Sequence, residues 1–309
     1  MPDGAVENVS DTAFWVAHYR AMENERPDAL FRDPLAARLA GEHGKKIADS
    51  IPLSRVTAWT LAIRTFIIDG FIKKALEEGV DTVVNLGAGL DTRPYRMELP
   101  SSLLWIEADY PKMIAYKEER LANERPCCRL ERVKIDLGDN VARRKLFDAV
   151  DARAKKLLVL TEGVIAYLSN EQVAALAADL HSLNHICYWI AEYFSPDVIK
   201  FRERTGVQKQ LQNAPFKFRP GNWFGFFAQH GWHAREARYL SEEGKRLHRP
   251  INLPLWMKIF GMVRAAFASK ARREHFRRFS AYVLFVPSPP GECRTNPAKA
   301  SRRSSKNSP

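Results

Sequence analysis

Long apolar runs and Cys-x-x-Cys pairs are both missing from this 309-residue sequence. No stretch of 18 or more apolar residues occurs, so we expect no membrane-spanning helix. The first residues do not join a charged region to an apolar one as a signal peptide does, which makes the cytoplasm the expected compartment. None of the four cysteines forms a Cys-x-x-Cys pair, and Cys127 and Cys128 are adjacent. Neither a disulfide framework nor a metal site is therefore expected.

Hydrophobic residues make up 46% of the chain, enough for the core of one large α/β domain. The net charge of +12 gathers partly at 264–278 and 294–306. Such charge is typical of a surface for nucleic acid, anionic lipid or an acidic carrier protein, but also of a solvated helix face and a disordered tail. Because no nucleic-acid-binding motif accompanies it, we favour the second interpretation.

The most informative segment is an apolar run over 83–86 that stops at Gly87-Ala-Gly89. A buried parallel strand that ends in a glycine loop brings its backbone close to a nucleotide-like ligand. Dinucleotide sites usually have a third glycine, where this chain has Thr92, preceded by Asp91. The Asp91 carboxylate would repel a pyrophosphate but not a sulfonium, so the loop favours S-adenosylmethionine over NAD.

Strand candidates recur at intervals that suit crossover helices, which predicts a parallel sheet covered on both faces. The expected strands are 81–87, 103–108, 130–135, 156–161, 186–193, 235–240 and 280–286.

Helices are expected over 11–49, with Asp33 as an N-cap and Pro34 in the first turn, and over 53–78, closing at Gly79. Further helices are expected at 111–123, 170–183 and 223–230. The predicted organisation is a single domain over 1–286, with N-terminal helices at 11–79 and a substrate-side insertion at 195–222, and a disordered basic tail at 287–309.

The loop 85–93 resembles the signature of the leucine carboxyl methyltransferase-like family of class I methyltransferases. The resemblance continues in order along the chain, at 12–23, 30–36, 63–69, 106–111, 136–137, 161–168 and 231–232. It implies a Rossmann-like sheet of seven strands with the last antiparallel, and S-adenosylmethionine as cofactor.

Ligands in open α/β sheets lie beyond the carboxyl ends of the strands, which selects candidate residues there. Glu107 and Asp109 end the second strand on one face, and an acid at this point can accept both ribose hydroxyls. The resemblance selects Asp109, with Glu107 as the partner of a base such as Arg93 the alternative. Asp136 and Leu137 could hold adenine through a side-chain acceptor and a backbone donor, unless Asp136 caps the next helix.

Three charged residues are candidates for the methionine end of the cofactor. Glu162 follows an apolar strand and would need a partner, either the ligand's ammonium or a structural base. Arg64 and Arg20 match basic positions of the family and could clamp a carboxylate. Each could instead form a structural pair, with Asp33 or Asp69.

The methyl acceptor is indicated only by aromatic residues. Those expected to line its pocket are Phe14, Trp15, Tyr19 and Tyr167, closed by Phe216, Phe218, Trp223 and Phe224 from the insertion. Methyl transfer needs mainly in-line alignment, and a carboxylate acceptor needs no base. A phenol would benefit from one, yet His18, His230 and His233 are more often packing residues, so the sequence names no catalytic base.

The sequence thus predicts an S-adenosylmethionine-dependent methyltransferase that methylates a carboxylate or hydroxyl oxygen of a small organic molecule. Its rivals are an NAD-dependent oxidoreductase, a protein C-terminal carboxyl methyltransferase of the same family, and a non-catalytic binder of nucleic acid or lipid.

Overall fold

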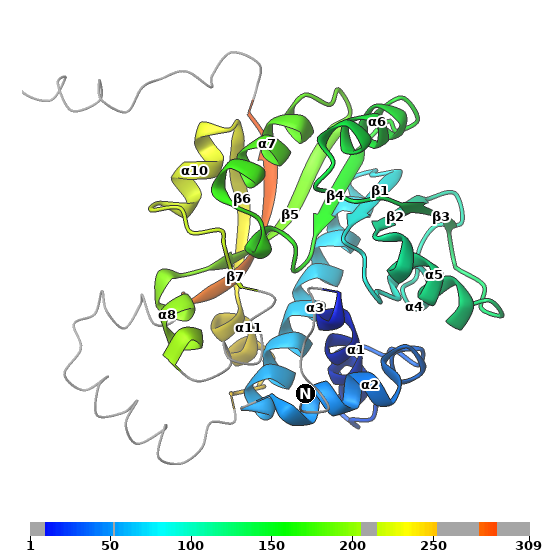
Figure 1. Cartoon of the computed structure of the whole chain (residues 1–309), viewed down its shortest axis with the longest axis vertical. Coiled ribbons are helices and arrows are strands. Elements are labelled where there is room, and N and C mark those ends of the chain that lie inside the picture. Colours follow the sequence, from blue (N-terminus) through cyan, green and yellow to red (C-terminus); the bar gives the residue numbers. More distant parts are fainter. Residues whose placement is uncertain (1–9, 52, 205–214, 252–277, 289–309) are drawn as a thin grey trace, which may run out of the picture.

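The structure is a computed structural model that describes residues 10–51, 53–204, 215–251 and 278–288. One seven-stranded sheet has the order β3-β2-β1-β4-β5-β7-β6, and β7 runs antiparallel to both of its neighbours (Figure 1). The strands are β1 (Thr82–Leu86), β2 (Leu104–Asp109), β3 (Arg129–Lys134), β4 (Leu157–Thr161), β5 (Ile186–Phe194), β6 (Trp232–Tyr239) and β7 (Ser280–Pro287). The predicted fold class and the antiparallel last strand are confirmed.

Helices cover both faces of the sheet. The helical elements are α1 (Asp11–Asn24), α2 (Ala36–Ser50), α3 (Ser54–Glu77), α4 (Arg93–Arg96), α5 (Pro111–Arg120), α6 (Asn140–Asp151), η1 (Ile165–Tyr167), α7 (Asn170–His181), α8 (Pro196–Arg204), α10 (Trp223–Gln229) and α11 (Leu240–Arg246). Side chains of α6, α7 and α10 pack into one core cluster, whereas α3 and Leu240 of α11 pack into a second on the opposite face. In Figure 1, α1 and α2 lie together beside α3.

Local sequence explains most of these boundaries. The five residues of β1 and of β4 are all buried, as expected of central parallel strands covered on both faces. Helix α7 begins with a capping box between Ser169 and Gln172, and Asp139 caps α6 by accepting hydrogen bonds from two backbone N–H groups. Among the described helices, none is both long and apolar enough to cross a bilayer.

The predicted N-cap at Asp33 is wrong. Helix α2 begins at Ala36 after Leu35, and the Asp33 carboxylate instead accepts hydrogen bonds from Arg20 Nε (2.9 Å) and Thr92 Oγ1 (2.7 Å). A buried carboxylate gains more from a guanidinium and a hydroxyl than from exposed backbone donors, so the tertiary contact prevails over the local one. Most of the predicted basic tail and of the 264–278 cluster lies outside the described residues.

Candidate cofactor and acceptor sites

The glycine loop after β1 has the backbone geometry that its residues suggest. Gly87 and Gly89 both have positive φ, +64° and +47°, a region that glycine enters without steric cost. A Cβ at position 87 would lie 2.5 Å from Val164 Cγ2, on the segment after β4. A Cβ at position 89 would lie 3.1 Å from Ala13 Cβ of α1. The loop is therefore enclosed by the end of β4 on one side and by α1 on the other.

Asp109, at the end of β2, reaches across to this loop. Its carboxylate accepts hydrogen bonds from the backbone N–H of Gly89 (2.6 Å) and of Tyr110 (2.7 Å), one on each oxygen. Each oxygen keeps a further lone pair, as acceptance of sugar hydroxyls requires. Desolvation by burial raises the pKa of Asp109 despite these two hydrogen bonds. Asp109 and Gly89 are thus brought together as the sequence predicted.

Asp136 and Leu137 follow β3 on the same edge of the sheet. The structure does not use Asp136 as a helix cap, because Asp139 caps α6; Asp136 Oδ1 accepts the Gly138 N–H at 2.8 Å. Leu137 lines a cavity of about 30 Å³ with Leu86 and Val164. This volume holds about one water molecule, so a purine could enter only if neighbouring side chains moved.

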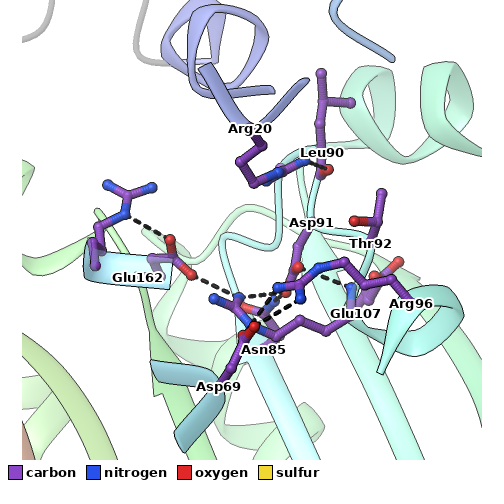
Figure 2. A network of polar contacts seen from close by, with 12 residues as sticks. Arg20, Asp69, Asn85, Leu90, Asp91, Thr92, Arg96, Glu107 and Glu162 are labelled. Atoms are coloured by element: carbon purple, nitrogen blue, oxygen red, sulfur yellow. Dashed lines mark hydrogen bonds and ion pairs between the residues drawn. The ribbon is translucent and has the colours of Figure 1, made fainter. Parts of the chain in front are cut away.

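Arg93 is the centre of a buried ionic cluster that the sequence did not identify as part of the site. Its guanidinium contacts Asp69 (2.7 Å), Asp91 (2.8 Å) and Glu162 (2.7 Å), and its side chain is 2% exposed. Arg96 donates two hydrogen bonds to Asp69, one to each carboxylate oxygen. Figure 2 shows these carboxylates converging on the cluster from the ends of β1 and β4 and from α3. The sequence signal for this cluster was the motif Asp91-Thr-Arg93, but Asp69 and Glu162, which Arg93 contacts, are remote from it in the sequence.

Glu162 has structural partners on both oxygens. Arg64 Nε of α3 lies 2.8 Å from Oε1, and Arg93 Nη1 lies 2.7 Å from Oε2. Burial alone would raise the pKa of Glu162, but the Arg93 and Arg64 charges hold it below its usual value of 4.5. The structural salt bridge weighed for Glu162 is therefore present, and its contact with a ligand ammonium remains a prediction.

Arg20 also takes the structural alternative. Its Nε binds Asp33 and its Nη2 donates to the Leu90 carbonyl, which fastens α1 to the glycine loop (Figure 2). Arg64 does not pair with Asp69, since Arg93 and Arg96 occupy that carboxylate.

One interpretation of the sequence paired Glu107 with Arg93, but the structure does not contain this pair. Its buried carboxylate contacts Lys117 Nζ at 2.6 Å and Arg132 Nε at 2.9 Å. Since Asp109 has no such bases on its oxygens among the described residues, the two acids of β2 have different surroundings.

A cavity of about 530 Å³ opens at the carboxyl end of β5. Six of its sixteen lining residues are aromatic, among them four predicted for the insertion: Phe216, Phe218, Trp223 and Phe224. Tyr167 stacks edge-on against Phe216, with ring centroids 5.4 Å apart. Phe14, Trp15 and Tyr19 do not line this cavity: Phe14 packs on His43 and Tyr116, and Trp15 and Tyr19 pack on each other. These three side chains pack between the N-terminal helices.

Glu192 of β5 lines the same cavity and was missed by the sequence interpretation. Its Oε1 accepts the Ala166 N–H at 3.1 Å, whereas its Oε2 is buried with no hydrogen-bond partner among the described residues. Desolvation raises the pKa of Glu192 from 4.5 to about 7. An acid inside the apolar strand Ile186–Phe194 was a usable signal, because such a residue is costly without a function or partner.

Strand order, the glycine loop and the acid after β2 together define the class: a Rossmann-like, class I methyltransferase. The sequence profile described as "Leucine carboxyl methyltransferase" matches residues 13–181, more than half of the chain. A candidate S-adenosyl-L-methionine-dependent methyltransferase of Parafrankia sp. is 31% identical, covering 82% of this chain and 85% of its own. Another from Streptomyces coelicolor is also 31% identical, covering 78% and 88% respectively. The chain belongs to the leucine carboxyl methyltransferase family.

A structural neighbour agrees with the fold. A DUF574 family protein from Streptomyces avermitilis superimposes with a TM-score of 0.51 at 13% identity, over 90% of this chain and 97% of its own. Family membership decides between the two nucleotides weighed for the glycine loop, and S-adenosylmethionine is the cofactor of this class of enzyme.

The residues at the strand ends fit such a cofactor chemically. The fit rests on a close backbone approach at Gly87 and on an acid with spare acceptor capacity at Asp109. No phosphate-binding group is needed for this nucleoside, in keeping with the buried carboxylate of Asp91 beside the loop.

Proposed function

We propose that this protein methylates an oxygen atom of a small organic molecule, with S-adenosylmethionine as methyl donor. The supporting observation is the cavity of about 530 Å³ at the end of β5. Its volume and aromatic wall suit one drug-sized, flat molecule. On this proposal residues 195–222 are a substrate-side insertion, since α8 and 215–222 contribute much of the wall.

We assign the cofactor-binding roles to the predicted residues. Gly87 and Gly89 admit the nucleoside, Asp109 accepts from its ribose, and Asp136 with the Leu137 backbone would hold adenine. Glu162 faces the methionine end, where Arg64 and Arg20 keep the surrounding loops in place through their ion pairs. The cofactor supplies an electrophilic methyl group on a sulfonium.

Calorimetric titration with S-adenosylmethionine tests this assignment. Asp109→Ala should weaken binding about 10- to 100-fold, because a charged acceptor of two hydrogen bonds is lost. Gly87→Arg should abolish binding by filling the space that Val164 borders. The matched control is Glu118→Ala, an exposed acid paired with Lys134, which should bind as the wild type does. Wild-type affinity in Asp109→Ala would contradict the site.

A thermal-shift screen should separate the rival functions. S-adenosylmethionine and S-adenosylhomocysteine should raise the melting temperature, and NAD and NADP should not, because a ligand stabilises only the state that binds it. Labelled S-adenosylmethionine incubated with a metabolite extract should label a small molecule. If a peptide ending in leucine were labelled instead, the protein-carboxyl alternative would be correct.

A further inference from the structure

The two candidate sites meet at Glu192. Glu192 lines the aromatic cavity, and its carboxylate accepts a hydrogen bond from the Ala166 backbone, on the segment that follows Glu162 of the cofactor cluster. Arg64, which binds Glu162, exerts its charge on Glu192 as well. Glu192 therefore lies between the aromatic cavity and the charged cluster that contains Glu162.

The two oxygens of Glu192, both on a buried side chain, differ in their hydrogen bonds. Oε1 is held by Ala166, which fixes the carboxyl group, while Oε2 has no partner among the described residues. A buried polar atom left without a hydrogen bond destabilises the fold, so it calls for an explanation such as a catalytic role. Strand β5 could have carried an apolar residue here at no such cost.

The polar and charged groups near Glu192 lie in two places, inside the protein and at the exposed end of the cavity. Arg64 of α3 and the Tyr282 hydroxyl of β7 interact with it electrostatically from inside the protein. Lys200 and Arg219 line the cavity too, but both are exposed. The cavity thus has an acid at its buried end and bases at its exposed end.

We propose that Glu192 is the general base of the reaction, and that the acceptor is an aromatic hydroxyl rather than a carboxylate. This inference rests on the proposed function. The acceptor oxygen forms the new C–O bond as the C–S bond breaks and its electron pair stays on sulfur. The hydroxyl proton passes to Glu192 Oε2 and later to water. The products are a methyl ether and neutral S-adenosylhomocysteine.

A carboxylate acceptor fits this arrangement poorly. It needs no base, and an ionised Glu192 would repel it at the buried end of the cavity. The exposed Lys200 and Arg219 would instead attract an anionic substituent at the opposite end of the ring. A pKa of about 7, raised by desolvation, lets Glu192 ionise and accept a proton near neutral pH.

The probe 6-hydroxy-2-naphthoic acid offers a hydroxyl and a carboxylate at opposite ends of one flat ring. With S-adenosylmethionine, mass spectrometry before and after alkaline hydrolysis should detect the methyl ether, which survives alkali; the isomeric methyl ester, which alkali cleaves, would overturn the inference. Glu192→Gln should lower kcat about 100-fold, and the rise of kcat with pH should disappear. Glu192→Asp, which keeps the carboxylate, should retain more activity than Glu192→Gln. The matched control is Glu131→Gln, an exposed strand acid paired with Arg153, which should behave as the wild type.

Binding of two probes to the complex of the protein with S-adenosylhomocysteine tests the inference without catalytic turnover. At pH 8.5 the wild type should bind 6-hydroxy-2-naphthoate at least tenfold more tightly than 2,6-naphthalenedicarboxylate, and Glu192→Gln should bind the two alike. Equal affinities in the wild type, or no binding of either probe, would overturn the inference. Absence of S-adenosylhomocysteine binding would instead contradict the proposed function itself.

Discussion

Buried carboxylates are paired with a cation beyond the end of β1 but not at the end of β5. Beyond β1, Arg93 satisfies Asp69, Asp91 and Glu162 with contacts of 2.7–2.8 Å. At β5, Glu192 keeps an oxygen that has no partner among the described residues, beside a large aromatic cavity. In the first region each of these carboxylates has a cationic partner without a ligand, whereas Glu192 forms no ion pair among the described residues.

This difference suggests that the first region has a structural role and the second a chemical one. A cluster of paired charges holds the glycine loop, α1 and the end of β4 in register, which fixes the shape of the proposed cofactor site. A single unsatisfied acid with a raised pKa is the kind of group that enzymes use to move protons. Breaking the first region should therefore damage stability, and changing the second should damage chemistry.

The largest effect is expected from Arg93→Met. Removing a buried cation leaves three carboxylates short of a partner, so the free energy of unfolding should fall by about 3–5 kcal/mol. Urea denaturation measures this loss. The matched control is Arg153→Met, whose pair with Glu131 lies on the surface and should contribute less than about 1 kcal/mol. Similar losses in the two variants would show that the cluster is not a structural centre.

The pH dependence of stability should have opposite signs in the two regions. Burial alone would raise the pKa of Asp69, but Arg96 and Arg93 hold it below 3.8, so its contribution is present above that pH and is lost as the pH falls through the lowered pKa. Glu192, with its pKa raised by desolvation from 4.5 to about 7, stabilises the fold fully below pH 4.5. That contribution of roughly 3 kcal/mol is lost as the pH rises to 7.

Glu192→Gln isolates this effect, because glutamine does not titrate. The unfolding free energy of the variant relative to wild type should increase between pH 4.5 and 7.5, as followed by urea denaturation at each pH. A difference that stays constant with pH would mean that Glu192 has an ordinary pKa.

A smaller loss is expected from Gly87→Ala. The new Cβ would meet Val164 at 2.5 Å and hold a positive φ, which together should cost about 1–3 kcal/mol. Gly221→Ala is the control, since a Cβ there meets no described atom within 4 Å and the backbone φ is outside the left-handed region. Thermal unfolding of both variants checks this, and equal melting temperatures would contradict the close approach at Gly87.

The smallest effects should separate two neighbouring acids. Asp139→Ala removes the cap of α6 and should cost about 1 kcal/mol of stability while leaving S-adenosylhomocysteine affinity unchanged. Asp136→Ala should cost less stability but weaken the affinity about tenfold, as expected for one lost hydrogen bond. Calorimetry on both variants compares them, and an unaffected Asp136→Ala would remove this residue from the adenine site.

Much of the fold could be predicted because its signals are local. The strand at 82–86 is a buried apolar run that ends in two glycines, and the helix at 54–77 carries a helical apolar repeat. Asp33 shows where local signals fail: a good capping residue before a proline serves Arg20 and Thr92 instead, because tertiary contacts outweigh the cap.

The site was predictable at strand ends and less so elsewhere. The spacing after the glycines indicates an acid at the end of β2, and the resemblance selects Asp109, whereas Arg93 binds Asp69 and Glu162 from two distant segments that no periodicity connects. Glu192 was visible as an acid in an apolar strand, but its unpartnered oxygen and the cavity beside it depend on the packing of 215–224. Family resemblance supplied the cofactor, and only the three-dimensional arrangement indicates the acceptor.

The most direct test is a crystal structure of the complex with S-adenosylhomocysteine and 6-hydroxy-2-naphthoate. We expect the ribose on Asp109, the naphthol oxygen within hydrogen-bond distance of Glu192 Oε2, and the carboxylate toward Lys200 and Arg219. A nucleoside bound away from Gly87 and Gly89, or a probe with its carboxylate against Glu192, would contradict the account.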